Sequence, residues 1–463
     1  MTIRQMLPQT TIRQTLPLTS DVIAAIAERY SEPAWMRAAR HAAWAFYESM
    51  SWPASNEEAW RRAHLERYPL DEMSLVFAPR PLDNLADLPP CWQYPLAPEA
   101  HVSGTLAHCN GSRAYGQMRA SDAENGVVLE DLHHALHTHG DLIRAHWMQG
   151  ATARPDFNRF TALNAALWHG GTFVYAPAGV RVARPLQSLV AHDADSGTSL
   201  HHTLIIAEAG SQVALIQDRV SQERRPEMSV EMVEIHAEPG AIVRYVSLQH
   251  WGAQRYAVSV QDATVGEKAK LLWITGAMGS RMSKEFLRSN LAAPGARAQI
   301  KGFTFAHGDQ RIDQSTYQHH SAPDTRSDLL MRNALRDRAR AIFYGMIRVE
   351  TEAAGAQAYQ ANNNLILAGA ALPGEARGMP RAHAIPGLEI IANEVQCSHG
   401  ATVSRIDPEQ LFYLESRGLP RPDAERLIVR GFMQPIVDYV PMAHIRQRLG
   451  DEIVQRYATD GRG

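Results

Sequence analysis

Cysteine is scarce in this chain. Only three cysteines occur among 463 residues: Cys91, Cys109 and Cys397. They are far apart, odd in number and in no C-x-x-C arrangement, which argues against a disulfide framework and against a cysteine-rich cluster site held by this chain alone. Isolated thiols fit a reducing compartment, so the expected location is the cytoplasm.

Several other features are missing. No apolar run is long enough to span a bilayer, and the first residues lack the apolar segment of a signal peptide. The formal net charge is −3, so no basic field favours nucleic acid or an anionic membrane as a partner. No G-x-x-x-x-G-K-[ST], G-x-S-x-G or H-E-x-x-H motif occurs, so any ATP chemistry would belong to a partner.

From residue 173 onward the chain breaks into short β-branched runs separated by similar turns. The turn glycines are spaced 31, 30, 26 and 29 residues apart, and an alternating strand follows each of them: Gly179, Gly210, Gly240, Gly266 and Gly295. Units too small to bury themselves, repeated at a near-constant period, predict a solenoid or another β-array. On this pattern a β-helix and a large sandwich or barrel of hairpins both stay open.

Helical patterns flank these repeats. Before them, apolar residues recur at helical spacing in residues 20–47 and 127–147, with a loop-rich stretch between. After them, Asp407 is placed to cap a helix that has Pro408 at its first position, Gln410 in the capping-box position and Gly418 at its end. The last helices are expected to cap the end of the repeats.

Three further segments are interpreted as structural. His319 and His320 are adjacent, so in a strand they face opposite ways and do not easily serve one site. The run QANNN at residues 360–364 predicts an asparagine stack along a solenoid turn. Residues 368–386 contain three glycines and three prolines, which predicts a loop.

Residues 394–403 alternate like a strand and place Cys397 and His399 on one face. Thiolate and imidazole are ligands that suit iron, zinc and iron–sulfur clusters. Two ligands make only half a tetrahedral site, so the others would have to come from elsewhere in the chain or from another subunit. A lone Cys-x-His pair in a strand is usually packing, and spacing alone favours that interpretation.

Residues 397–419 read CSHGATVSRIDPEQLFYLESRGL. This run closely resembles the C-terminal signature of SufD, within the SufB/SufD family of iron–sulfur cluster assembly subunits. The segment from Pro33 to Trp60 and the runs GTFVYAPAG at 171–179 and HTLIIAEAG at 202–210 resemble the same family. The resemblance therefore covers nearly the whole chain, weakly before residue 20 and between 69 and 126.

The resemblance implies a mainly β fold, in which a right-handed parallel β-helix core is flanked by N-terminal and C-terminal α-helical domains. The expected division is a mobile tail at 1–19, a helical region with a loop-rich linker at 20–155, the β-helix at 156–405 and a helical domain at 406–463. The role of the tail, which contains a short duplication, is not assigned.

The same resemblance implies a non-catalytic scaffold subunit of a SufB–SufC–SufD complex. Such a chain pairs with SufB through the β-helices, and a nascent iron–sulfur cluster forms transiently at the junction, with no cofactor held permanently by this chain alone. His399 would act there as a transient metal ligand shared with SufB, with Cys397 as a second contributor. In isolation the chain would form a homodimer. The helical tail would dock the SufC ATPase through Gln410, Phe412, Tyr413, Arg417, Gly418, Leu427 and Phe432.

Three alternatives stay open. A SufB-type paralogue would carry extra cysteines, but residues 360–367 contain none, and residues 399–402 read HGAT where SufB has a sequence closer to HEAT. A β-helix carbohydrate enzyme would need acidic residues clustered on one solenoid face, whereas Asp and Glu fall mostly in turns. A plain binding protein would use His399 only for packing.

Overall fold

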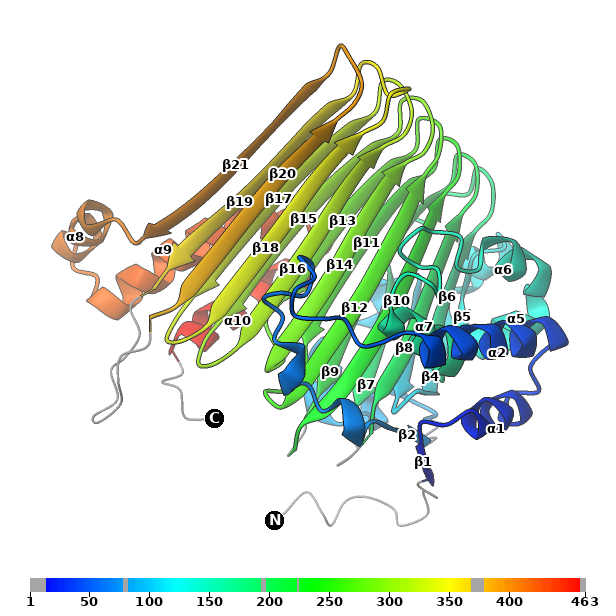
Figure 1. Cartoon of the computed structure of the whole chain (residues 1–463). Helices are drawn as coiled ribbons and strands as arrows, with labels where there is room; N and C mark the ends of the chain where they lie inside the picture. The colour runs from blue at the N-terminus through cyan, green and yellow to red at the C-terminus, as the bar shows by residue number, and fades with distance from the viewer. Residues whose placement is uncertain (1–13, 78–81, 193–196, 223–224, 368–378, 459–463) are drawn as a thin grey trace, which may run out of the picture.

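The computed structural model describes residues 14–77, 82–192, 197–222, 225–367 and 379–458. Its centre is a parallel β-solenoid in which two long sheets face each other (Figure 1). Successive strands of the solenoid alternate between the two sheets, so each coil contributes one strand to each sheet. The predicted mainly β fold, a parallel solenoid flanked by helices, is confirmed, and the sandwich of hairpins is excluded.

The nine-stranded sheet contains, in spatial order, β20 (Arg381–Ile390), β18 (Arg340–Val349), β16 (Arg311–His320), β14 (Met282–Leu291), β12 (Arg255–Val265), β10 (Glu227–Ala237), β8 (Ser199–Ala207), β6 (Gly170–Ala176) and β5 (Val128–Asp131). The ten-stranded sheet contains β21 (Gln396–Arg405), β19 (Gln357–Ile366), β17 (Arg326–Leu335), β15 (Arg297–Ala306), β13 (Lys270–Ala277), β11 (Ile242–His250), β9 (Gln212–Ser221), β7 (Leu186–His192), β3 (Gly104–Cys109) and β4 (Ser112–Met118).

Alternation along each strand sends every second side chain into the lumen of the solenoid. Because the strands pair in register, equivalent positions of successive coils stack in files. One buried file on the ten-stranded sheet consists of Tyr245, Trp273, Ile300 and Leu329. Stacking of this kind explains why a single coil cannot fold alone but neighbouring coils share one continuous core.

The turns between the two sheets stack as regularly as the strands. Gly210 and Gly240 both have a φ of 71°, in the left-handed region that glycine adopts without strain. The Gly210 N–H donates to Pro239 of the next turn at 2.9 Å. In the following coil Lys268, rather than the predicted Gly266, has the positive φ. Gly266 is needed for a close approach, since a Cβ there would lie 2.9 Å from the Ala237 oxygen.

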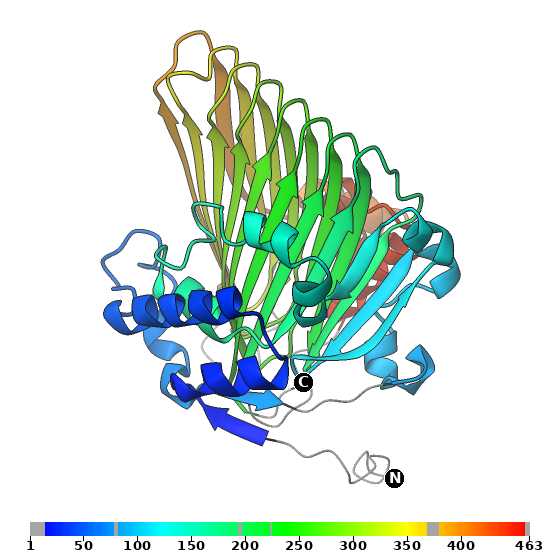
Figure 2. The same cartoon turned by 90° about the vertical axis from the view of Figure 1, so that its right-hand side faces the viewer.

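The N-terminal helices cover the outer face of the nine-stranded sheet (Figure 2). They are α1 (Asp21–Arg29), α2 (Ala34–Ser49), α5 (Leu132–Thr138), α6 (Gly140–His146) and α7 (Arg159–Leu167), accompanied by the antiparallel pair β1 (Gln14–Pro17) and β2 (Ser74–Phe77). The short helix α3 (Pro90–Gln93) packs instead on strands of the ten-stranded sheet, and α4 (Ala120–Glu124) follows β4. The helix predicted at residues 127–147 is wrong at its start, because β5 pairs antiparallel with β6 before Asp131 caps α5.

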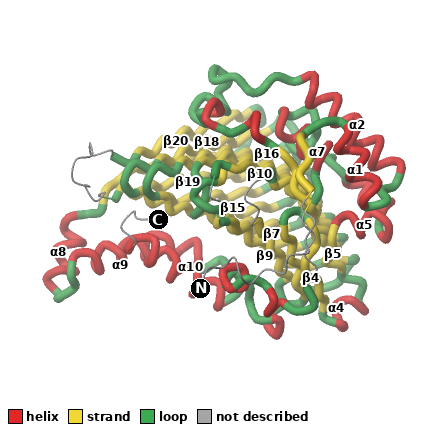
Figure 3. The backbone as a smooth tube through the Cα atoms, turned by 90° about the horizontal axis from the view of Figure 1, so that it is seen from below, coloured by secondary structure: helices red, strands yellow, loops and turns green. Residues whose placement is uncertain are grey.

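The C-terminal helices lie on the opposite side and cover the outer face of the ten-stranded sheet (Figure 3). They are α9 (Arg421–Val437) and α10 (Ala443–Ala458), and α8 (Pro408–Ser416) packs against α9. Asp407 caps α8 as predicted, accepting a bond from the Glu409 N–H at 2.8 Å. Within the described ranges, no helix is both long and apolar enough to cross a membrane.

The loop predicted at residues 368–386 is partly wrong. Residues 368–378 lie outside the described residues, but β20 already begins at Arg381 and contains Pro386. Proline lacks an N–H and is tolerated at a sheet edge, and β20 is the terminal strand of its sheet. The proline and glycine content therefore predicted a loop where the structure has an edge strand.

Candidate functional site at the open end of the solenoid

The two ends of the solenoid differ. At the N-terminal end, the outermost strands β4 and β5 are antiparallel to their single neighbours, and α5 packs beside β5 and β6. At the C-terminal end, β20 and β21 are the outermost strands, and each pairs with only one neighbour (Figure 1). Such edges present unpaired backbone N–H and C=O groups to another chain. This end of the solenoid, called here the open coil (β20 and β21), is the natural surface for strand pairing.

Cys397 and His399 both lie on the open coil and face the lumen. The register aligns Cys397 with Ala358 and His399 with Gln360, whose side chains are buried in the preceding coil. Cys397 and His399 therefore lie on the same face of β21, as predicted. His399 is exposed at the end of the lumen, and Cys397 is half-buried. Burial raises the pKa of the Cys397 thiol above its ordinary value, which favours its protonated form.

Apolar side chains are also exposed on the open coil. Leu388 and Ile390 occupy lumen-facing positions of β20, in register with the fully buried Ile347 and Val349, yet they are 37% and 42% exposed. Val403 on β21 is 55% exposed. The same lumen positions are thus sealed in the preceding coil and open in the last one. Sequence reasoning missed this apolar rim because residues 381–386 were assigned to a loop.

A buried polar file lies directly behind His399. Asn364 donates to Asn362 at 2.6 Å and accepts from Asn333 at 2.8 Å, so asparagines of successive coils do contact each other. They lie within the strands β17 and β19, however, and not in the predicted turn. The Gln360 Oε1 and the Asn362 Nδ2 are buried without a hydrogen-bond partner. Unsatisfied polar atoms are costly in a protein interior, and similar atoms occur in earlier coils, for example on Thr316 and Gln318.

The metal-binding capacity of the chain is limited. Among the described residues, no group of three or more His, Cys, Asp and Glu side chains is arranged to hold a metal ion. Cys397 and His399 therefore offer two donors, and a four-coordinate centre would need the others from a second chain. The two histidines at 319 and 320 face opposite ways as predicted: His319 contacts Glu350 on the outside, and His320 contacts Ser327 in the lumen.

The C-terminal residues named from the sequence fall into two groups. The first group is exposed on α8, in the turn after it and on α9: Gln410, Phe412, Tyr413, Arg417, Gly418 and Leu427. Phe412 is 71% exposed and Leu427 is 50% exposed. Phe432 differs, because it packs partly buried against the sheet, where the Arg332 guanidinium lies 5.1 Å from its ring. The predicted bond from Gln410 back to the cap does not occur among the described contacts of α8.

The fold and the site together define a β-solenoid with helical flanks, whose C-terminal coil is uncovered among the described residues. Comparison with known proteins shows to which family this architecture belongs. The family described as SufBD protein N-terminal region matches residues 14–188, and the SufBD core domain of the SUF system for iron–sulfur cluster assembly matches residues 190–432. The chain belongs to the SufB/SufD family of iron–sulfur cluster assembly proteins.

Individual relatives do not separate the two branches of the family by identity. The chain is 26% identical to the iron–sulfur cluster assembly protein SufD of Bacillus subtilis over 445 residues, 95% of this chain and 98% of the relative. It is 28% identical to SufB of the same organism over 351 residues, 76% of this chain and 73% of the relative. A SufBD family protein of Staphylococcus epidermidis is 26% identical over 444 residues, 92% of this chain and 90% of the relative.

Proposed function

We propose that this chain is a SufD-type, non-catalytic scaffold subunit that pairs with a SufB-type subunit in a SufB–SufC–SufD complex of the cytoplasm. The observation that carries the proposal is the open coil, where Cys397 and His399 lie on an unpaired edge strand of a coil that also exposes apolar side chains. An incomplete donor set at an unpaired edge suits a site that two chains complete together.

Pairing through the open coil would have three favourable effects. Strand addition at β20 or β21 would supply partners for the free backbone groups. Covering the exposed part of Leu388, Ile390 and Val403 would contribute on the order of 1 kcal/mol for each side chain. A second chain could also supply the metal donors that Cys397 and His399 lack.

The chemistry assigned to this chain at the junction is ligation and positioning. The His399 imidazole is exposed and offers a nitrogen donor to iron, and Cys397 offers a sulfur once its proton is lost. Because burial favours the protonated thiol of Cys397, His399 is the first donor and Cys397 the second. The nascent cluster is cargo that leaves the site, and the remaining ligands would come from the SufB-type chain.

Coverage and local sequence support the SufD assignment over the SufB one. The alignment with the Bacillus SufD extends over nearly both whole chains, whereas that with SufB omits about a quarter of each. The stretch 360–367 contains no cysteine, and Gly400 follows His399 where SufB has an acidic residue. The exposed Phe412, Tyr413 and Leu427 would dock a SufC-type ATPase, which would supply the nucleotide hydrolysis.

Co-expression with the cognate SufB-type and SufC-type chains tests this proposal. The variant His399→Ala should form the complex normally, as judged by size-exclusion chromatography, but lose cluster content measured by visible absorbance and iron–sulfide analysis. The matched control is His383→Ala, because His383 is on the same coil but on its outer face, in register with Ile342. The proposal fails if His399→Ala matures clusters like wild type, or if no complex with a SufB-type chain forms.

A further inference from the structure

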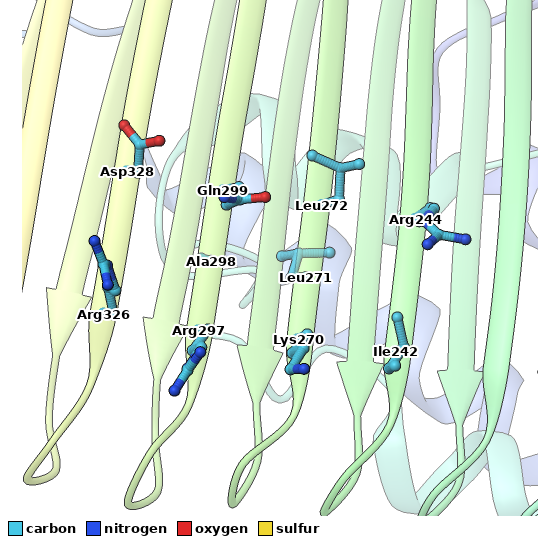
Figure 4. A pocket seen from close by; sticks show the side chains of 10 residues that line it. All are labelled: Ile242, Arg244, Lys270, Leu271, Leu272, Arg297, Ala298, Gln299, Arg326 and Asp328. Atoms are coloured by element: carbon cyan, nitrogen blue, oxygen red, sulfur yellow. The ribbon is translucent and has the colours of Figure 1, made fainter. Parts of the chain in front are cut away.

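A row of basic side chains crosses the outer face of the ten-stranded sheet and ends at Arg326, two strands before the open coil. Lys270, Arg297 and Arg326 begin β13, β15 and β17, and the register places each beside the next (Figure 4). Adjacent strands are about 4.8 Å apart, so three exposed cations stand one strand apart in a line. Arg244 on β11 adds a fourth in the neighbouring row. These four residues are called here the basic row.

The fold does not neutralise the basic row. Within the described ranges, no ion pair links any of its four members to a carboxylate. One acid, Asp328, lies in the same groove, but it pairs with Lys301 at 2.6 Å. Like charges directly opposite each other on neighbouring strands are destabilising. In the free protein the cations of the basic row therefore repel one another, and an anionic ligand would reduce this repulsion.

The basic row lines a groove of about 470 Å³ that also has apolar walls. Ile242 lies beside Lys270 at the end of the row, and Leu272 lies beside Arg244 (Figure 4). Leu272 also packs against the cluster that holds the C-terminal helices, and α9 crosses β15 and β17 on this same sheet face. The sheet thus already accepts one helix that runs across its strands, and the groove lies beside it.

We propose that the groove binds an acidic amphipathic helix of a partner protein. Carboxylates at positions i and i+4 of a helix are about 5–6 Å apart, close to the strand spacing that separates the cations. Apolar residues of the same helix would cover Ile242 and Leu272. Nucleic acid fits less well, because the row spans only a few strands, the chain has a net charge of −3, and the Asp328 carboxylate would repel phosphates. This inference does not depend on the proposed function.

A direct binding measurement tests the inference on the full chain. The probe is a fluorescein-labelled synthetic helix with glutamate on one face and leucine on the other, titrated by fluorescence anisotropy at low and high salt. Wild type should bind it, and added salt should weaken binding. The variant Lys270→Gln/Arg297→Gln/Arg326→Gln should bind about tenfold more weakly, as expected for the loss of three exposed charge pairs.

The matched control removes the same charge elsewhere. Arg37, Arg67 and Arg144 are exposed on the N-terminal region, and their triple change to Gln should leave affinity unchanged. Thermal unfolding shows whether both variants stay folded. The inference is overturned if wild type does not bind the probe, if the groove variant binds as well as wild type, or if a glutamine version of the probe binds equally. Tighter binding of a single-stranded oligonucleotide would instead identify a nucleic-acid surface.

Discussion

Arg40, whose side chain is fully buried, joins α2 to the C-terminal end of α7. Its guanidinium pairs with the Glu32 carboxylate at 2.6 Å and donates to the Ala166 and Trp168 carbonyls at 3.0 and 2.9 Å. Burial alone would raise the pKa of Glu32, but Arg40 and His133 outweigh it and hold that pKa at about 2. Both partners are therefore charged at neutral pH, and each compensates the burial of the other.

Removing one charge of this pair should be costly. The variant Glu32→Gln leaves the buried Arg40 guanidinium without a counter-charge, and we expect a loss of about 3–5 kcal/mol in the free energy of unfolding, measured in urea. Glu58→Gln, which breaks an exposed pair with Arg62, is the control and should cost less than about 1 kcal/mol. An equal effect of the two changes would contradict this interpretation.

The same pair sets a pH dependence with a definite sign. The pKa of Glu32 is lower in the folded protein than the ordinary value of 4.5. Its contribution to stability is therefore fully present above pH 4.5 and is lost as the pH falls through about 2. The difference between wild type and Glu32→Gln should shrink over that acid range.

At the scale of elements, α10 is held on the ten-stranded sheet by a charged cluster as well as by its apolar face. His250 at the end of β11 contacts Glu452 of α10 at 2.8 Å and Asp218 of β9 at 3.4 Å. Arg448 of α10 pairs with Asp218 at 2.8 Å. Burial disfavours the charged imidazole, but Glu452 and Asp218 outweigh it and raise the pKa of His250.

The docking of α10 should therefore weaken as the pH rises. A raised pKa in the folded protein means that the contribution of His250 is fully present below its unfolded pKa of about 6.5 and is lost as the pH rises through the folded value. Hydrogen exchange in α10, corrected for intrinsic rates, should accelerate over this range in wild type. His250→Gln should remove the pH dependence, whereas His444→Gln, an exposed position on α10, should keep it. A pH-independent wild type would refute this role.

Element by element, the sequence was most informative where local pattern decides the structure. The repeated turn glycines and alternating strands predicted a β-array, and period-two alternation placed Cys397 and His399 on one face. Only the family resemblance favoured the parallel solenoid over a sandwich. The local pattern does not reveal which strands pair, because each strand pairs with the strand one full coil away in the sequence. The rim of Leu388 and Ile390 was missed because Pro386 indicates a loop until the strand is known to lie at an edge.

At the scale of the whole molecule, one end of the solenoid stays uncovered among the described residues. The isolated chain is expected to bury Leu388 and Ile390 against a second copy, since an exposed edge with apolar side chains favours self-pairing. Light scattering after size-exclusion chromatography should then show a dimer that dissociates on dilution. Leu388→Asp/Ile390→Asp should shift the protein toward the monomer.

A control on another surface makes this result specific. Phe46 on α2 is also exposed, and Phe46→Asp should leave the dimer intact. A wild-type chain that is monomeric at every concentration, or a double variant that still dimerises, would show that the open coil does not pair with itself.

The single-neighbour position of β20 and β21 also has a consequence for how the protein comes apart. In a stack of coils, the strands of an interior coil pair with neighbours on both sides, but those of the last coil pair on one side only. Thermal fraying therefore begins at the coil that carries Cys397 and His399. A partner that adds its own strands turns this last coil into an interior one. Each protein then caps the solenoid of the other, and the pair unfolds as one longer solenoid.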